Sequence, residues 1–228
     1  EIGNSPLAHV STIHSFLWTI ARSFQVDIRE WVGRRIDEKI ADLEAKVAKP
    51  RTQRTTIARA REEIGRLQKQ RAEISKVRHF VYSSGSDYSE GILGHDDIIR
   101  MVPALLQENT LFRAIVAGLF PCVLVDESQD TAADVVECLK AIAKDPACDT
   151  FCLGFFGDPM QKIYTAGFGD ICAEEGWERI TKLDNFRCSV KVLATINRIR
   201  AAADGIEQTL GRFEQFGNER RPVQGAAR

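Results

Sequence analysis

Apolar residues recur at helical spacing through two long segments in the first third of the chain. The first segment covers about 30–48, and its apolar positions are Ile36, Ile40, Leu43 and Val47. Pro50 ends this pattern, because its ring removes a hydrogen-bond donor and disfavours helix at the preceding residue. The second segment covers about 53–81, with Ile57, Ile64, Leu67, Ile74 and Val77 at helical spacing. Together they predict a helical hairpin, closed by a turn-rich stretch at 83–89.

Beyond residue 90, short uninterrupted apolar runs alternate with amphipathic segments. The runs at 122–125 and 150–156 predict buried strands, and a third short strand is expected at 180–183. Helical patterns are found at 96–107, 111–117, 131–144 and 190–203. Apolar strands that alternate with helices are typical of a parallel sheet covered on both faces. The pattern therefore predicts an α/β fold with a parallel sheet and helices on both faces.

The composition indicates a folded chain without a membrane segment. Of the 228 residues, 44% are hydrophobic and 28% are charged, with 31 Lys and Arg against 32 Asp and Glu, which excludes wholesale disorder. No stretch of about 18 uncharged apolar residues occurs, and residues 1–10 lack the features of a secretory signal, so we expect no membrane partner. The six cysteines include no C-x-x-C pair, which favours reduced thiols and a cytoplasmic location.

The charge is unevenly distributed along the chain. Residues 34–80 carry 14 Lys and Arg but 7 Asp and Glu, a local net charge of +7, so the remainder carries −8 of the total of −1. Two interpretations fit this basic segment: a solvated helical hairpin, or an arm that lies along nucleic-acid phosphates. The composition of the segment does not decide between them.

Candidate chemistry lies where the predicted strands end, which is where parallel sheets place their ligands. The stretch 126–130, with the sequence DESQD, directly follows the strand at 122–125. The carboxylate of Asp126 is a hard oxygen ligand suited to Mg²⁺, and Glu127 could orient and deprotonate a water that attacks a phosphoryl group. The alternative interpretation is a strand-end carboxylate pair that caps the following helix.

Two further polar clusters follow the other predicted strands. In the first, GDPMQKIY at 157–164, Gln161 could sense a terminal phosphate. In the second, LDNFRCS at 183–189, Arg187 could supply bidentate positive charge to a transferring phosphoryl group. Taken alone, either residue is commonly a surface residue. Other residues receive plainer interpretations. We expect surface or core-edge positions without ligand spacing for His9, His79 and His95, reduced thiols that bind no metal for Cys148 and Cys152, and packing rather than base-stacking roles for Trp18, Trp31 and Trp177.

The order and spacing of these clusters resemble the motifs of the UvrD/Rep/PcrA-like superfamily 1A DNA helicases. VLVDESQDT at 123–131 resembles their motif II, GDPMQKIY at 157–164 their motif III, and LDNFRCS at 183–189 their motif IV. STIHSF at 11–16 resembles motif Ib, a single-strand contact, and GHDDII at 94–99 weakly resembles a D-F-x-x-L segment. The resemblance runs from about residue 10 to residue 199.

The resemblance implies a fold and a domain order. Residues 1–29 and 91–205 would form the first RecA-like domain of a P-loop NTPase, with its parallel sheet. Residues 30–90 would form an inserted α-helical subdomain of the 1B type, which helps to guide DNA. Residues 206–228 would be a linker toward a second RecA-like domain.

The resemblance also implies an activity: ATP hydrolysis with Mg²⁺, coupled to 3′→5′ movement on single-stranded or tailed duplex DNA. The implied nucleotide-site residues are Asp126 for Mg²⁺, Glu127 for water activation, Gln161 for coupling the γ-phosphate to DNA, and Arg187 for the γ-phosphate. The implied DNA-contact residues are Thr12, His14, Phe16 and Tyr164.

The sequence departs from the family pattern in two places. No G-x-x-x-x-G-K-[ST] occurs, so we expect the phosphate-binding loop to precede residue 1 and this chain alone to be a poor ATPase. After Tyr164, the family's usual G-W-R-G is replaced by TAGF, so that Phe168 would have to substitute for a base-stacking Trp. The competing hypothesis is a catalytically silent, helicase-like scaffold that binds DNA or a partner, such as a nuclease subunit in DNA repair or anti-phage defence.

Overall fold

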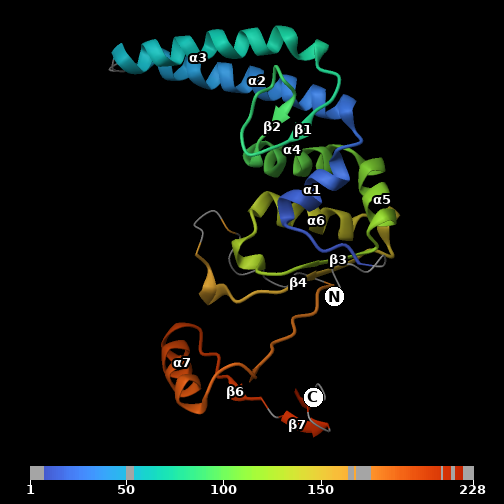
Figure 1. Ribbon diagram of the computed structural model, residues 1–228, viewed down its shortest axis with the longest axis vertical. Helices are drawn as coiled ribbons and strands as arrows, with labels where there is room; N and C mark the ends of the chain where they lie inside the picture. Colours follow the sequence, from blue (N-terminus) through green and yellow to red (C-terminus); the bar gives the residue numbers. More distant parts are fainter. Residues whose placement is uncertain are drawn as a thin grey trace. The chain divides into compact units, whose positions relative to one another are not determined.

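The computed structural model describes residues 8–49, 54–163, 167, 176–211, 213–216 and 219–222. Contacts divide the chain into two units, Glu1–Ile171 and Cys172–Arg228, which we describe separately. The first unit contains two long helices, a group of shorter helices and two pairs of strands (Figure 1). The predicted domain boundaries at 29, 90 and 205 stay predictions, and Tyr164 and Phe168 lie outside the described residues.

The two long helices, α2 (Gln25–Ala48) and α3 (Arg54–Glu73), lie side by side and form the helical hairpin that the sequence predicted (Figure 1). We call this pair of helices the arm. Helix α2 begins earlier than the predicted residue 30, because its first turns are buried in the core through Ile28, Trp31 and Val32. The first part of α2 therefore anchors the arm, and the later part projects from the core.

The prediction of one helix through 53–81 was wrong. Helix α3 ends at Glu73 and is followed by a 3₁₀ turn, η2 (Ile74–Lys76). The chain leaves the helix there because Val77 and Phe80 are buried in the core of the unit. The guanidinium of Arg29 in α2 donates to the carbonyl oxygen of Val77 at 2.7 Å and fixes this exit.

Shorter helices form the core of the first unit. They are α1 (Ile13–Ala21), α4 (His95–Glu108), α5 (Thr110–Leu119) and α6 (Ala133–Lys144). Their apolar stripes supply fully buried residues, among them Leu17, Ile98, Leu106 and Leu139. A short parallel pair, β1 (Val81–Tyr82) and β2 (Ile92–Leu93), connects the arm to α4. No helix in the described part of the chain is long and apolar enough to cross a membrane.

The predicted strands at 122–125 and 150–156 are confirmed as β3 (Cys122–Val125) and β4 (Cys152–Phe155), which pair in parallel. The expectation of a sheet covered on both faces was wrong for the described residues. Val123 and Val125 are buried in the core, whereas Leu124 on the opposite face is 63% exposed. An apolar run does not reveal which of its faces is covered, because burial depends on elements that lie elsewhere in the sequence.

The second unit contains helix α7 (Val190–Ala203), whose bounds match the prediction. The third strand was predicted at 180–183, but the structure places β5 at Asp184–Asn185, where it pairs in parallel with β6 (Thr209–Leu210). An antiparallel pair follows, β7 (Phe213–Phe216) and β8 (Glu219–Pro222). The described part of the stretch predicted as a linker, 206–228, therefore contains short strands.

Candidate functional site

The acidic pair lies where the sequence predicted it, directly after β3. Asp126 and Glu127 are both exposed, and Oδ1 of Asp126 accepts a hydrogen bond from the backbone N–H of Glu127 at 2.9 Å. Glu127 has a left-handed backbone conformation with φ of 50°, which is uncommon for a residue with a side chain. This conformation turns the chain sharply out of the strand and into the 3₁₀ turn η3 (Ser128–Asp130). Strain of this kind is often found at functional sites.

The loop after β4 lies against this turn. The backbone N–H of Ser128 donates to the carbonyl oxygen of Phe156 at 2.9 Å, which extends the parallel pairing past the strands. The backbone N–H of Ile163 donates to Oδ1 of Asp130 at 3.0 Å. The loop between these two contacts contains η5 (Pro159–Gln161) and the predicted phosphate sensor, Gln161. The two motifs that are separate in sequence are therefore side by side in the structure.

Gln129 connects the two loops through both ends of its side-chain amide. Its Nε2 donates to Oε2 of Glu127 at 2.7 Å, and its Oε1 accepts from the backbone N–H of Asp158 at 3.2 Å. The side chain is buried, with 1% of the residue exposed. A buried amide that is satisfied at both ends holds its partners in a fixed geometry.

Gln161 completes the connection. Its Nε2 donates to Oδ2 of Asp158 at 3.1 Å, while Oδ1 of Asp158 caps η5 by accepting from the N–H of Met160. A hydrogen-bonded path therefore runs from Glu127 through Gln129 and Asp158 to Gln161. The structure brings together three of the predicted site residues, Asp126, Glu127 and Gln161, at one edge of the β3–β4 pair.

Gly157 lets the two loops approach each other. A Cβ atom at this position would lie 2.4 Å from Oε1 of Gln129 and 2.8 Å from Oγ of Ser128, so a larger residue would push the loops apart. The sequence interpretation quoted Gly157, Gln129 and Asp130 within its motifs but gave them no role. Strand-end position alone could have placed them near the site, but their contacts depend on the register of two loops.

The acidic pair has the chemistry of a magnesium site. Among the described residues, no group donates a hydrogen bond to Oδ2 of Asp126 or to Oε1 of Glu127, so each carboxylate keeps one oxygen for a ligand. The described residues contain no group of three or more His, Cys, Asp or Glu side chains that could enclose a metal. Mg²⁺ fits such a site, since it commonly binds one or two carboxylates and takes its other ligands from water and phosphate.

Arg187 belongs to the second unit, in the turn between β5 and α7. Its side chain is exposed, and its backbone N–H donates to Oδ1 of Asn185 at 3.0 Å. Asn185 also accepts from the N–H of Cys188 at 3.1 Å, which stabilises the turn that presents the guanidinium. The contribution of Arg187 to the site formed by the first unit stays a prediction.

The predicted DNA contacts on α1 differ in their exposure. Thr12 is the exposed N-cap of α1, where its Oγ1 accepts from the N–H of Ser15 at 3.3 Å, and His14 in the first turn is half-buried. Phe16 is 9% exposed and makes an edge-to-face contact with Phe120, with ring centroids 5.2 Å apart. The ring of Phe16 therefore faces the core, and only Thr12 and His14 lie open to a ligand.

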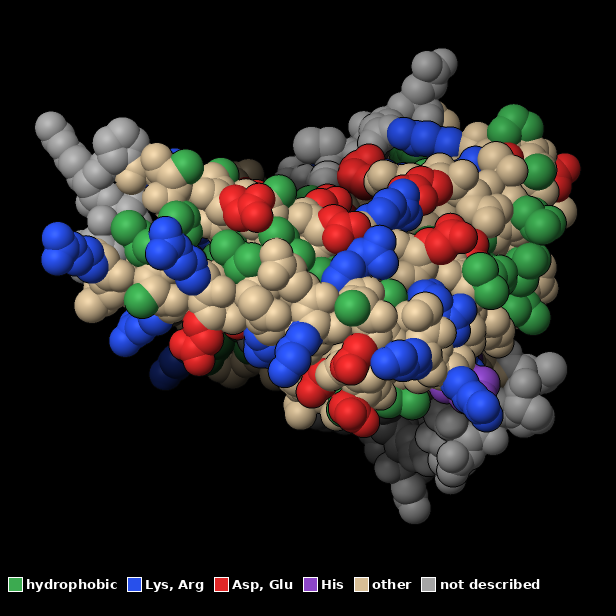
Figure 2. Space-filling view, turned by 90° about the horizontal axis from the view of Figure 1, so that it is seen from above, with side chains coloured by type: hydrophobic (Ala, Val, Ile, Leu, Met, Phe, Trp, Pro, Cys, Tyr) green, Lys and Arg blue, Asp and Glu red, His purple; other side chains and the backbone are tan. Residues whose placement is uncertain are grey.

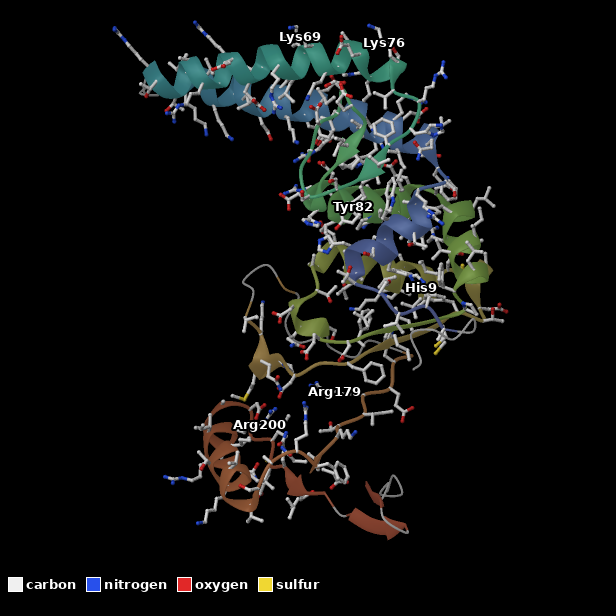
Figure 3. The ribbon with its side chains drawn as sticks, viewed as in Figure 1. His9, Lys69, Lys76, Tyr82, Arg179 and Arg200 are labelled. Atoms are coloured by element: carbon white, nitrogen blue, oxygen red, sulfur yellow. The ribbon has the colours of Figure 1, made fainter. Side chains whose placement is uncertain are left out.

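The arm presents basic side chains on its outer surface. Figure 2 shows Lys and Arg along the arm, with Asp and Glu between them. Figure 3 shows Lys69 of α3 and Lys76 of η2 on the side that faces away from the core. Some arginines are paired, including Arg66 with Glu63 at 2.6 Å and Arg71 with Asp37 at 3.0 Å. Four exposed basic residues of α3 form no ion pair within the described part of the chain, namely Arg54, Arg59, Arg61 and Lys69.

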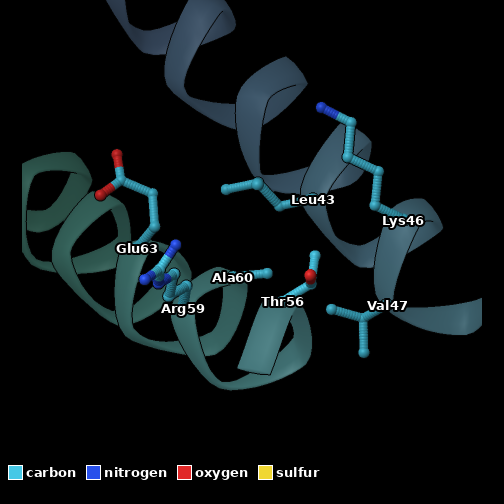
Figure 4. Close-up of a pocket in the computed structure, with 7 residues that line it drawn as sticks. All are labelled: Leu43, Lys46, Val47, Thr56, Arg59, Ala60 and Glu63. Carbon is cyan, nitrogen blue, oxygen red and sulfur yellow. The ribbon is translucent and has the colours of Figure 1, made fainter. Parts of the chain in front are cut away.

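Near its tip, the arm is hollowed between its two helices. The cavity has a volume of about 360 Å³, and Figure 4 shows Lys46 and Arg59 among its lining residues. Its apolar lining comes from Leu43, Val47 and Ala60. None of the predicted site residues lines the cavity.

Comparison with known proteins supports the family resemblance that the sequence motifs indicated. Residues 5–169 match the family model of the UvrD/REP helicase N-terminal domain. The Gabija protein GajB of Bacillus cereus (strain HuB5-5) is 31% identical over 133 residues, which cover 56% of this chain and 19% of GajB, so the chain spans about a fifth of that relative's length. No solved structure gives a significant match. Because the family match covers more than half of the chain, the chain belongs to the UvrD/REP helicase family, and residues 5–169 correspond to the N-terminal domain of that family.

Proposed function

We propose that the chain is the N-terminal part of an ATP-dependent DNA helicase or translocase of superfamily 1A, which moves 3′→5′ along single-stranded DNA. Its cofactors would be ATP and Mg²⁺, and its binding partner would be single-stranded or tailed duplex DNA. The observation that carries the proposal is the hydrogen-bonded path from Glu127 to Gln161 at the carboxyl ends of β3 and β4. In this proposal the two strands belong to the sheet of a first RecA-like domain, formed by 1–29 and 91–205, with residues 30–90 as its helical insert.

The residues at the strand ends would share the work of hydrolysis. Asp126 would hold Mg²⁺, which supplies positive charge to the phosphate oxygens when bound. Glu127 would take the proton of the attacking water at Oε1, while the amide of Gln129 holds its other oxygen. Gln161 would sense the terminal phosphate, and Arg187 would supply further positive charge during transfer.

The same path offers a route from the nucleotide to DNA. Gln161 lies in the loop that ends at Ile163, whose backbone is held by Asp130, and Tyr164 follows directly. A shift of Gln161 on phosphate release would therefore displace the segment that carries Tyr164. Thr12 and His14 on α1 would contact the strand, and the unpaired cations of α3 would follow its phosphates.

The central test is Glu127→Gln in the full-length protein. We expect nucleotide binding to be retained and DNA-stimulated hydrolysis to fall about 100-fold or more, since the general base is lost while the shape of the side chain is kept. Binding is measured with a fluorescent ATP analogue and hydrolysis by phosphate release. The control is Glu90→Gln, which neutralises an exposed carboxylate outside the site. Unchanged turnover in Glu127→Gln would remove Glu127 from this role.

The second candidate function is a helicase-like scaffold that does not turn over ATP and binds DNA or a partner protein, such as a nuclease subunit. The observation that favours it is the row of exposed cations on α3 that form no ion pair in the described part of the chain, since these side chains can bind nucleic acid without nucleotide. The two functions differ in how DNA binding responds to nucleotide. A DNA affinity that changes with ATP, together with ATP hydrolysis, supports the motor. A DNA affinity that is the same with and without ATP supports the scaffold.

A further inference from the structure

Four ring side chains from three elements form a cluster that begins at the predicted DNA contact His14. His14 and Trp18 lie one turn apart on α1, Tyr82 ends β1, and His95 opens α4. The ring centroids are 5.0 Å apart for His14 and His95, 5.3 Å for Tyr82 and His95, and 6.5 Å for Trp18 and Tyr82. The hydroxyl of Tyr82 is also hydrogen-bonded to Nδ1 of His95. We call these four residues the ring cluster.

The ring cluster is both held in place and accessible. His95 is exposed, and His14, Trp18 and Tyr82 are half-buried, with Trp18 and Tyr82 packed against the hydrophobic core. Figure 3 shows Tyr82 in the part of the first unit between the arm and α1. A ring that is packed on one side and open on the other loses little conformational freedom when a flat ligand stacks on it.

The charges around the ring cluster do not favour a phosphate. Asp96 is exposed next to His95 and close enough to act on His14. The pKa of His14 is lowered, first by burial and then by the neighbouring His95, although Asp96 opposes this shift. His14 therefore tends to be neutral at physiological pH and offers a ring face rather than positive charge.

We infer that the ring cluster stacks unpaired nucleobases of the DNA strand that the proposed helicase binds. This inference rests on the proposed function, and it adds Tyr82, His95 and Trp18 to the contact surface at Thr12 and His14. Every nucleobase presents a π face, so stacking on these rings holds a strand without reading its sequence. The arm supplies the phosphate contacts, and the ring cluster supplies the base contacts.

The experiment compares two oligonucleotides of equal length and charge, a thymidine oligonucleotide and an abasic one, by fluorescence anisotropy with the purified protein. We expect the parent to bind the thymidine strand more tightly. Tyr82→Ala and His95→Ala should each weaken thymidine-strand binding at least about fivefold and leave binding of the abasic strand unchanged. Tyr82→Phe should keep most of the preference, because the stacking ring remains. The matched control is His79→Ala, which removes an exposed imidazole outside the cluster.

The outcomes separate this inference from the function on which it rests. If the parent binds neither strand, DNA binding itself fails and the inference falls with it. If the parent binds both strands equally, or if His95→Ala keeps the full preference, DNA binding stands and the ring cluster has no stacking role. A loss as large in His79→Ala as in His95→Ala also overturns the inference. If Tyr82→Ala does not fold, Tyr82→Phe and His95→Ala test the stacking role of the ring cluster.

Discussion

Gln129 contacts both loops of the candidate nucleotide site through a single side-chain amide. Gln129→Leu keeps the approximate size of the side chain but leaves the N–H of Asp158 and the carboxylate of Glu127 without this partner. We expect the free energy of unfolding to fall by about 1–3 kcal/mol, measured by chemical denaturation. The control is Gln107→Leu at an exposed position, with an expected effect within about 0.5 kcal/mol. Equal stability of the two variants would contradict a holding role for Gln129.

An ionisable replacement at the same residue tests its link to catalysis. Gln129→Glu removes the amide N–H that donates to Oε2 of Glu127 and places a second carboxyl group beside it, so hydrolysis by the full-length protein should fall more than nucleotide binding does. Hydrolysis is measured by phosphate release, and binding with a fluorescent ATP analogue. An equal loss of binding and hydrolysis would indicate a general loss of stability instead.

The types and positions of the candidate site residues could be predicted from the sequence, but their contacts could not. The acidic pair and Gln161 were placed at strand ends, and the structure brings them to one edge of the β3–β4 pair. The partner of Glu127 could not be predicted, because the left-handed turn at Glu127 decides where Gln129 points. The ring cluster was missed for a similar reason. His95 and Tyr82 lie far from His14 in sequence and meet only through the packing of α1, β1 and α4.

At the scale of elements, a buried polar network joins the arm to α4. The hydroxyl of Tyr88 donates to Oδ1 of Asp97 at 2.7 Å and accepts from Nζ of Lys39 in α2 at 2.6 Å. Oδ2 of Asp97 accepts from the N–H of Gly94 at 3.0 Å and caps α4. Burial raises the pKa of Tyr88, so its hydroxyl keeps the proton that it donates to Asp97. The network therefore fixes the root of the arm relative to the start of α4.

Tyr88→Phe should loosen this root. The change leaves Lys39 and the buried Asp97 without one hydrogen bond each, so we expect unfolding to require about 1–3 kcal/mol less free energy. Tyr82→Phe is the matched control, because Tyr82 is half-buried and water can replace its lost hydroxyl. In thermal denaturation, we expect the melting temperature of Tyr88→Phe to lie below that of Tyr82→Phe. The reverse order would show that the network does not stabilise the arm.

The elements that could be predicted were those with a local cause. Helix α7 has the predicted bounds, and β3 follows the apolar run at 122–125. The end of α3 could not be predicted, since helical spacing continues to Val77 but the core draws Val77 and Phe80 out of the helix. The strand at Asp184–Asn185 was misplaced because its pairing with β6 depends on a segment more than twenty residues further along.

On the scale of the whole molecule, the charge is divided between a basic arm and an acidic remainder. The +7 of residues 34–80 does not establish DNA binding, because several arginines of the arm pair with acidic neighbours. The cations of α3 that form no ion pair in the described structure, among them Arg54, Arg61 and Lys69, are the ones able to neutralise phosphates. Because these cations are exposed, the two original interpretations, solvated hairpin and DNA-binding arm, predict different responses of DNA binding to salt.

The salt dependence of DNA binding distinguishes the two interpretations. A triple variant, Arg54→Glu, Arg61→Glu and Lys69→Glu, removes up to three phosphate contacts, so the slope of log affinity against log salt should flatten by about 2 for a single strand. The control is Arg54→Lys, Arg61→Lys and Lys69→Arg, which keeps the charge and should keep the slope. An unchanged slope in the charge-reversal variant would make the arm a solvated hairpin. A flattened slope together with an unaltered preference for thymidine over abasic strands would show that phosphates and bases are held by different parts of the first unit.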